Sequence, residues 1–84
     1  MNSEQKDLLK GHIIEYLSLE DVEKNEIEDG APLFGDGLGL DSIDALELIV
    51  MIEREYGVKI ADPSKGKEIL YSVDTIANYI DSNK

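Results

Sequence analysis

Apolar residues recur at helical spacing in three separate segments of this chain, residues 3–17, 42–56 and 73–80. Side chains three or four positions apart share one face of a helix, so each segment has an apolar face to bury against another. Ser72, directly before the third segment, is a residue type that caps the first turn of a helix. A β-strand shows apolar and polar residues in alternation and needs a second strand to pair with, and no segment here has both. The pattern therefore predicts an all-α fold.

The segments between these helices predict a small four-helix bundle. Asp62 followed by Pro63 is the pattern of a helix start, and Gly66 limits this helix to a short one. The connection from Leu19 to Leu40 contains four glycines and one proline, so no regular helix runs through it. It still carries apolar side chains that we expect to contact the core: Val22, Ile27, Leu33, Phe34, Leu38 and Leu40. We expect three main helices and one short helix, with a long loop between the first and second helices.

A chain of 84 residues has room for one core, because independent domains usually need about 50 residues or more. We therefore expect residues 1–84 to form a single domain. No cysteine is present, so neither a disulfide nor a thiolate–metal site can contribute. His12 has no partner histidine, and one imidazole cannot build a metal site, so no metal is expected.

The chain is strongly acidic, with 8 lysines and arginines against 19 aspartates and glutamates and a formal charge of −11. Nucleic acids and anionic membrane surfaces are bound through cationic patches, so neither is an expected partner. No window approaches the roughly 20 apolar residues of a membrane span, and the N-terminal segment has no secretory pattern. We expect a cytoplasmic monomer without stable membrane insertion, whose partners present basic patches.

The segment from Ser42 to Tyr56 has apolar residues on two sides. A helical wheel places one uncharged group on the arc expected to face the core: Ala45, Leu48, Ile49, Ile52 and Tyr56. Four further apolar residues lie among charges on the opposite arc: Ile43, Leu46, Val50 and Met51. Those charges belong to Asp44, Glu47, Arg54 and Glu55. Apolar side chains mixed with carboxylates are typical of a docking face for a basic partner, so we predict one here.

Ser42 lies at the start of this segment, directly after Asp41. Asp41 is a strong N-cap, and Asp44, three residues on, resembles the second residue of a capping box. Ser42 then falls in the first turn, where unpaired backbone N–H groups and the helix dipole favour an anion. The serine is either an ordinary cap-region residue or the attachment point of a phosphodiester, and these physical arguments leave both interpretations open.

Other chemistries for this serine are excluded by spacing. A nucleophilic serine needs a base, and the single histidine lies in the first helix without a G-x-S-x-G motif. A phosphate-binding loop needs a preceding strand and a lysine after its glycines, and neither is present. A calcium loop from Asp36 to Glu47 would have Leu38 and Leu40 as ligands and Asp41 in place of the obligatory glycine.

The run LGLDSIDALELIVMIEREYGVKI resembles the second-helix region of acyl carrier proteins, whose hallmark is Asp-Ser-(Leu/Ile) where a loop meets a helix. Here the hallmark is Asp41-Ser42-Ile43, and the resemblance covers nearly the whole chain. It implies that Ser42 carries 4′-phosphopantetheine, attached from coenzyme A by a separate phosphopantetheinyl transferase, and that the terminal thiol of this arm holds an acyl group as a thioester. The protein would catalyse nothing itself, and Asp41 would help to position metal and substrate during modification.

The resemblance also assigns two groups of residues. The transferase and the acyl-loading, condensing and modifying enzymes would read a face made of Ile43, Asp44, Leu46, Glu47, Val50, Met51 and Glu53. Glu53 is the exception to the wheel, which places it at the edge nearer the core. The acyl chain would enter the interior beside Ala45, Leu48, Ile49 and Ile52.

The chain departs from the common fatty-acid carriers in three places. Arg54 stands where those carriers usually have an acidic residue, and the segments FGDGLGLDS and ADPSKGKEILYS are slightly longer. The resemblance therefore implies acyl carriage in fatty-acid, polyketide or a related specialised biosynthesis without choosing among them. Two alternatives remain open. One is an aminoacyl carrier, either peptidyl or D-alanyl, and the other is a non-carrier acidic helical adaptor in which Ser42 stays unmodified.

Overall fold

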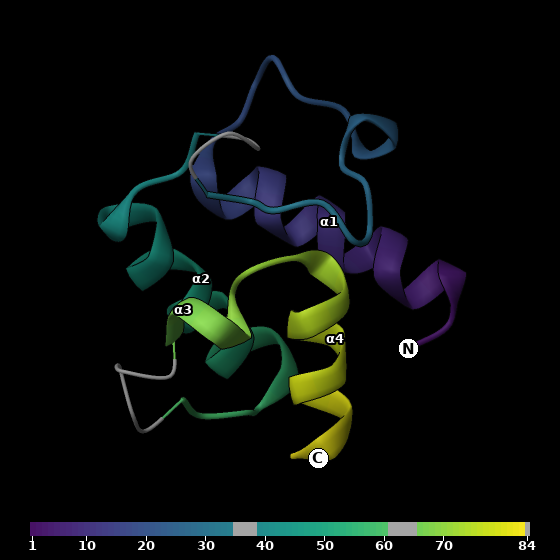
Figure 1. Ribbon diagram of the computed structural model, residues 1–84, viewed down its shortest axis with the longest axis vertical. Helices are drawn as coiled ribbons and strands as arrows, with labels where there is room; N and C mark the ends of the chain where they lie inside the picture. Colours follow the sequence, from purple (N-terminus) through teal and green to yellow (C-terminus); the bar gives the residue numbers. More distant parts are fainter. Residues whose placement is uncertain (35–38, 61–65, 84) are drawn as a thin grey trace.

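The computed structural model describes residues 1–34, 39–60 and 66–83. Its regular elements are all helical (Figure 1), which confirms the all-α prediction. In chain order they are α1 (Ser3–Leu17), the 3-10 helix η1 (Lys24–Glu26), α2 (Ser42–Tyr56), α3 (Gly66–Ile69) and α4 (Val73–Ser82). The described residues thus form a small bundle of three main helices and one short helix.

Side chains cap the first turns of the main helices. In α1 the side chain of Asn2 accepts a hydrogen bond from the Gln5 N–H at 2.8 Å, and the Gln5 side chain accepts one from the Asn2 N–H at 2.9 Å. In α4, Ser72 and Thr75 form the same reciprocal pair, which confirms Ser72 as the predicted cap. α2 ends at Gly57, whose φ of 68° is a left-handed conformation that favours glycine.

The core lies between α1, α2 and α4, because α1 packs against both of the other helices (Figure 1). It receives buried side chains from each of them: Leu9, Ile13, Leu48, Met51, Ile52, Val73, Ile76, Ala77 and Ile80. The apolar stripe predicted in the last helix is therefore confirmed. Full burial of a large aliphatic side chain stabilises the fold by about 1.5–3 kcal/mol, so these contacts outweigh the helix propensities of the segments.

The long connection between α1 and α2 follows the core. All of its described anchors are buried or partly buried there: Val22, Ile27, Leu33, Phe34 and Leu40. Leu38, the remaining predicted anchor, lies outside the described residues. Phe34 and Leu40 also form an isolated parallel β-bridge, which closes the end of the loop that leads into α2. The prediction of a long loop held by apolar anchors is confirmed for the residues that are described.

Thr75 joins α3 to α4. Its hydroxyl donates a hydrogen bond to the carbonyl of Ile69 at 2.8 Å, so the end of α3 is linked to the first turn of α4. Leu70, in the turn between the two helices, is buried. The helix start predicted at residues 62–63 lies outside the described residues, and α3 as described begins at Gly66. The short helix and the main helix after it therefore behave as one hydrogen-bonded unit.

Candidate functional site

The junction between the loop and α2 is a complete capping box. Oδ1 of Asp41 accepts hydrogen bonds from the N–H groups of Ile43 and Asp44 at 3.0 and 3.1 Å. Oδ2 of Asp44 accepts one from the Asp41 N–H at 3.0 Å. The predictions that Asp41 is the N-cap and Asp44 its partner are confirmed. Gly39, with a φ of 72°, supplies the left-handed turn just before this cap.

Ser42 is the first residue of α2, and it is exposed. Because the Asp41 side chain satisfies the cap, the Ser42 hydroxyl is not needed for it, and among the described residues no hydrogen bond holds this hydroxyl. The positive end of the helix dipole lies at the same turn and favours a negatively charged substituent. The hydroxyl is thus accessible to an enzyme and electrostatically suited to carry a phosphodiester.

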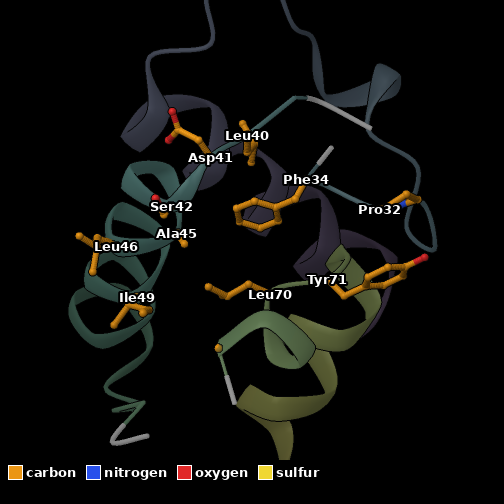
Figure 2. Close-up of a pocket in the computed structure, with 11 residues that line it drawn as sticks. Pro32, Phe34, Leu40, Asp41, Ser42, Ala45, Leu46, Ile49, Leu70 and Tyr71 are labelled. Carbon is orange, nitrogen blue, oxygen red and sulfur yellow. The ribbon is translucent and has the colours of Figure 1, made fainter. Parts of the chain in front are cut away.

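A cavity of about 560 Å³ opens beside Ser42 (Figure 2). Its lining comes from the α1–α2 loop, the first half of α2, and α3 with the turn after it: Pro32, Phe34, Leu40, Asp41, Ser42, Ala45, Leu46, Ile49, Gly66, Leu70 and Tyr71. The side chains of Phe34 and Leu70 extend toward α2, whereas the ring of Tyr71 turns away from it (Figure 2). Small-molecule sites commonly enclose about 300–1,000 Å³. This cavity therefore has the size and the mostly apolar lining to hold a hydrocarbon chain.

Two of the four residues predicted for an acyl pocket line this cavity. Ala45 and Ile49 do so, but Leu48 and Ile52 are fully buried in the core and are not part of the lining. Leu48 is one position before Ile49, and one residue turns a helix by about 100°. That rotation directs Leu48 to the centre of the bundle, so Leu48 and Ile52 lie in the core and not in the lining of this cavity, and their part in an acyl pocket stays a prediction.

Sequence reasoning missed the opposite walls of the cavity. Phe34 and Leu40 were identified only as anchors of the loop, and Leu70 and Tyr71 were not assigned to any site. The available signal is an apolar pair directly before the Ser72 cap, together with an aromatic residue in the loop before the serine. Nothing in the local spacing indicates that these segments meet, because the tertiary packing of α1 and α4 brings them together.

Three exposed apolar side chains lie in a row along the outward side of α2. The exposed fractions are 68% for Ile43, 63% for Leu46 and 41% for Val50. Exposed charged residues flank this row: Glu47, Glu53 and Arg54. We call these six residues the outer face of α2. Asp44 is only half-exposed because its carboxylate turns back to the Asp41 N–H.

Met51 does not belong to this outer face. Its side chain is fully buried, so the prediction that it contributes to an exposed docking face is wrong. On the wheel Met51 lies within about 40° of Asp44 and Glu55, but these acids are about 10 and 6 Å away along the helix axis at 1.5 Å per residue. They reach solvent at the two ends of α2, while the middle of the same side packs inward. For Glu53 the wheel and the structure disagree in the opposite direction. The wheel places Glu53 near the core, and the structure shows it exposed.

His12 lies at the contact between α1 and α2. Its ring meets that of Tyr56 edge-to-face, with the ring centroids 5.8 Å apart. Burial, with a smaller effect of the Glu55 carboxylate, raises the pKa of Tyr56. Within residues 1–34, 39–60 and 66–83, no three histidine, cysteine, aspartate or glutamate side chains are grouped to hold a metal ion. None of the described helices combines the length and apolar character that crossing a bilayer requires.

The protein-family model described as "Phosphopantetheine attachment site" matches residues 7–64 of this chain. The chain is also similar to a protein of Zymomonas mobilis subsp. mobilis named "Acyl carrier protein". The two are 35% identical over 82 residues, which cover 98% of this chain and 97% of that relative. The span matched by the family model includes the capping box, Ser42 and all of α2.

Proposed function

The chain belongs to the acyl carrier protein family, and from that premise we propose that Ser42 is the residue to which phosphopantetheine is attached. The observation that carries the proposal is an exposed serine hydroxyl, free of the helix cap, at the edge of an apolar cavity. As a member of this family the protein is a non-catalytic carrier. We further propose that residues 1–84 act as one carrier domain.

In the proposed modification, a separate phosphopantetheinyl transferase supplies the catalysis. The Ser42 oxygen forms a phosphodiester bond with the phosphopantetheine half of coenzyme A, the nucleotide half leaves with its phosphate, and the serine proton is lost to the transferase or to water. The N-terminal turn of α2 then stabilises the negative phosphodiester. Asp41 keeps that turn in place and helps to position metal and substrate, and the terminal thiol of the arm takes up the cargo as a thioester.

The cavity supports an acyl cargo over an aminoacyl one. Polar atoms of its lining belong mainly to Asp41 and Ser42 at one edge and to Tyr71, whose ring turns away. A hydrocarbon chain gains about 0.8 kcal/mol for each CH₂ group that it buries, whereas a buried ammonium group loses its hydration and meets in the lining a carboxylate, Asp41, that already accepts two backbone N–H groups. We therefore propose that the cargo is an acyl intermediate of fatty-acid, polyketide or related specialised biosynthesis.

The outer face of α2 is the proposed docking surface for partner enzymes. Ile43, Leu46 and Val50 supply apolar area that can be buried, and Glu47 and Glu53 favour a basic patch opposite them. The partners would be the transferase and the acyl-loading, condensing and modifying enzymes. A cytoplasmic location and a monomeric state remain parts of this proposal.

Intact-mass measurement tests the attachment site. The apo protein is incubated with coenzyme A, Mg²⁺ and a broad-specificity phosphopantetheinyl transferase. We expect one phosphopantetheine on the wild type and none on Ser42→Ala. Ser3→Ala is the matched control, because Ser3 is also exposed and also follows the N-cap of a helix. An unmodified wild type, or equal addition to Ser42→Ala, contradicts the proposal.

The kind of cargo is tested on the holo form. Acyl-activating and amino-acid-activating enzymes are offered in parallel, and the thioester formed is identified by mass. We expect loading with acyl groups. Loading with amino acids alone would make this chain an aminoacyl carrier.

A further inference from the structure

Four charged residues join the α1–α2 loop, α1 and α4. Nζ of Lys10 lies 2.6 Å from Oδ1 of Asp29, and Nζ of Lys6 donates a hydrogen bond to Oδ1 of Asp74 at 2.9 Å. Lys6 Nζ also lies 4.0 Å from Oδ2 of Asp29. The two lysines are one helical turn apart on α1, so a single face of α1 holds both the loop and the start of α4. We call Lys6, Lys10, Asp29 and Asp74 the ionic clasp.

Backbone hydrogen bonds reinforce the same connection. The Asp74 N–H donates to the Asp29 carbonyl at 2.9 Å, and the Leu33 N–H donates to the Tyr71 carbonyl at 2.8 Å. The clasp residues are close in sequence to the residues that line the cavity. Pro32 and Phe34 follow Asp29, and Tyr71 precedes Asp74. The loop wall and the α3–α4 wall of the cavity are therefore attached to each other and to α1.

The lysines of the clasp are more shielded than its carboxylates. The side chains of Lys10 and Lys6 are 16% and 27% exposed, whereas those of Asp29 and Asp74 are each 43% exposed. The hydrogen bond and charge of Lys10 lower the pKa of Asp29, and the hydrogen bond to Asp74 raises the pKa of Lys6. Partly shielded ion pairs are screened less by salt than fully exposed ones, and the backbone hydrogen bonds between Asp29 and Asp74 and between Leu33 and Tyr71 support the same connection.

The third wall of the cavity is attached differently. It consists of Ala45, Leu46 and Ile49 on α2. Among the described residues, no hydrogen bond or ion pair joins α2 to residues 29–34, to α3 or to α4. The β-bridge between Phe34 and Leu40 ties the loop to the residue just before the cap of α2, and α2 itself is held by apolar packing, mainly against α1. The cavity thus has two walls that are joined by polar bonds and one wall that can adjust.

We propose that the ionic clasp, by fixing the loop wall against the α3–α4 wall, limits the length of the acyl chain that the cavity accepts. This inference rests on the proposed function, because it assigns Asp29 and Lys10 a part in cargo selection. With the clasp intact, space for a longer chain comes only from movement of α2. When the clasp is broken, the loop and the α3–α4 turn can also separate, and longer chains fit.

A chain-length series measures this limit. Butyryl, hexanoyl, octanoyl, decanoyl and dodecanoyl phosphopantetheine are attached by the broad-specificity transferase from the corresponding acyl-coenzyme A. The change in Tm relative to the unacylated holo form is recorded for each. A chain that is buried in the folded protein but not in the unfolded one raises Tm, so Tm increases with length until the cavity is full. In each protein, Tm stops rising at a certain chain length. We expect this chain length to be greater in Asp29→Asn and Lys10→Gln than in the wild type, by at least one member of the series.

Lys24→Gln is the matched control. Lys24 forms an ion pair with Asp7 at 3.5 Å, so the substitution also removes a lysine and an ion pair of α1 but leaves the cavity walls joined. We expect the wild-type limit for this variant. The proposal is overturned if the limit is the same in all four proteins, or if Lys24→Gln moves it as much as Lys10→Gln does. Because each variant is compared with its own unacylated form, a general loss of stability does not imitate the effect.

Failure of the clasp and failure of the proposed function give different results. If no acyl-phosphopantetheine attaches at Ser42, the proposed function itself fails. If the chains attach and raise Tm equally in every variant, the carrier function stands and only the clasp proposal is rejected. Should Asp29→Asn not fold, Lys10→Gln provides the same comparison with the carboxylate retained.

Discussion

Asp41 has two roles in the proposed carrier, and they can be separated by substitution. Its carboxylate accepts two backbone N–H groups of α2, so Asp41→Ala leaves both without their partner and should cost about 1 kcal/mol of folding free energy. Asp41→Asn keeps an acceptor oxygen and should retain most of that stability. Both variants lose the charge that helps to position metal and substrate, so both should be modified more slowly.

Urea unfolding and the rate of phosphopantetheine addition check the two roles independently. A slow but stable Asp41→Asn protein is the expected pattern. If Asp41→Asn were modified at the wild-type rate, the role of the Asp41 charge would be limited to the cap.

Met51 and Val50 are neighbours in sequence with opposite surroundings. Met51 is fully buried, so Met51→Ala leaves a cavity in the core and should destabilise the protein by about 2–5 kcal/mol. Val50 is exposed, and Val50→Ala should change the free energy of unfolding by no more than about 0.5 kcal/mol. Urea unfolding of both variants, with Met51→Leu as a volume-conserving control, measures the contrast. If Met51→Ala and Val50→Ala lowered the free energy of unfolding equally, Met51 would not be a core residue.

The error over Met51 has a simple physical origin. A wheel projects the helix along its axis and therefore places Met51 beside Asp44 and Glu55, although these acids lie near opposite ends of α2. Within α2 the fully buried residues are Leu48, Met51 and Ile52, and α1 is the helix that α2 chiefly contacts. The sequence identifies which residues share an angular sector, but the depth of each along the axis depends on where the neighbouring helices cross.

At the scale of a helix, the outer face of α2 carries one cation, Arg54, among its acids. If partner enzymes present basic patches, Arg54 repels them, and Arg54→Glu should lower the KM of the phosphopantetheinyl transferase about fivefold at low salt, as expected for a charge at the rim of an interface. The difference should shrink at high salt because exposed charges are screened.

Lys59→Glu makes the same change in net charge at an exposed position outside the outer face of α2. We expect it to leave the KM close to the wild-type value. A KM that is raised by Arg54→Glu would indicate an acidic group opposite Arg54 in the transferase, and an unchanged KM would place Arg54 outside the interface.

Helix caps explain why the main helices could be predicted and the short elements could not. Asp41 and Ser72 are strong boundary signals that act as predicted from the sequence, and Gly57 ends α2 as a left-handed cap residue. η1 has only three residues and its form depends on how the loop is held to the core, so no periodic pattern reveals it. Gly66 was expected to limit a short helix, and the described helix instead starts at this residue.

At the scale of the whole molecule, the charge on Asp29 connects segments that are distant in sequence. The hydrogen bond and charge of Lys10 hold the pKa of Asp29 below its usual value of 3.8, so its ionisation stabilises the fold above that pH. This contribution is lost as the pH falls through the lowered pKa of the folded protein. For Lys6, whose pKa is raised above 10.5, the contribution is present below that pH and is lost in stronger alkali.

The difference in Tm between the wild type and Asp29→Asn isolates the Asp29 contribution. We expect a constant difference between about pH 5 and pH 8, and a decrease below about pH 4 as the Asp29 carboxylate takes up its proton. Thermal unfolding followed by circular dichroism measures both proteins under the same conditions. If the Tm difference between the wild type and Asp29→Asn grew as the pH was lowered, the ionised Asp29 carboxylate would not be the stabilising group.

The cavity also belongs to the whole molecule, and this limits what could be predicted of it. The periodicity of α2 places Ala45 and Ile49 on its inward side, and the family resemblance implies their contact with an acyl chain. Phe34, Leu70 and Tyr71 line the cavity because tertiary contacts hold the loop beside the turn before α4, such as the hydrogen bond from the Leu33 N–H to the Tyr71 carbonyl. Such contacts between distant segments leave no regular spacing in the sequence.

The division of α2 into sides bears on how carriers of this kind can diverge. Leu48, Met51 and Ile52 hold the bundle together, whereas Ala45 and Ile49 border the cavity and Val50 and Glu53 meet solvent. Substitutions that alter cargo or partner can therefore accumulate without unfolding the protein. Leu46 is the exception, since it borders the cavity and is also 63% exposed. A substitution at Leu46 changes the cavity and the outer face of α2 at the same time. Cargo preference and partner preference can therefore change together through this one position.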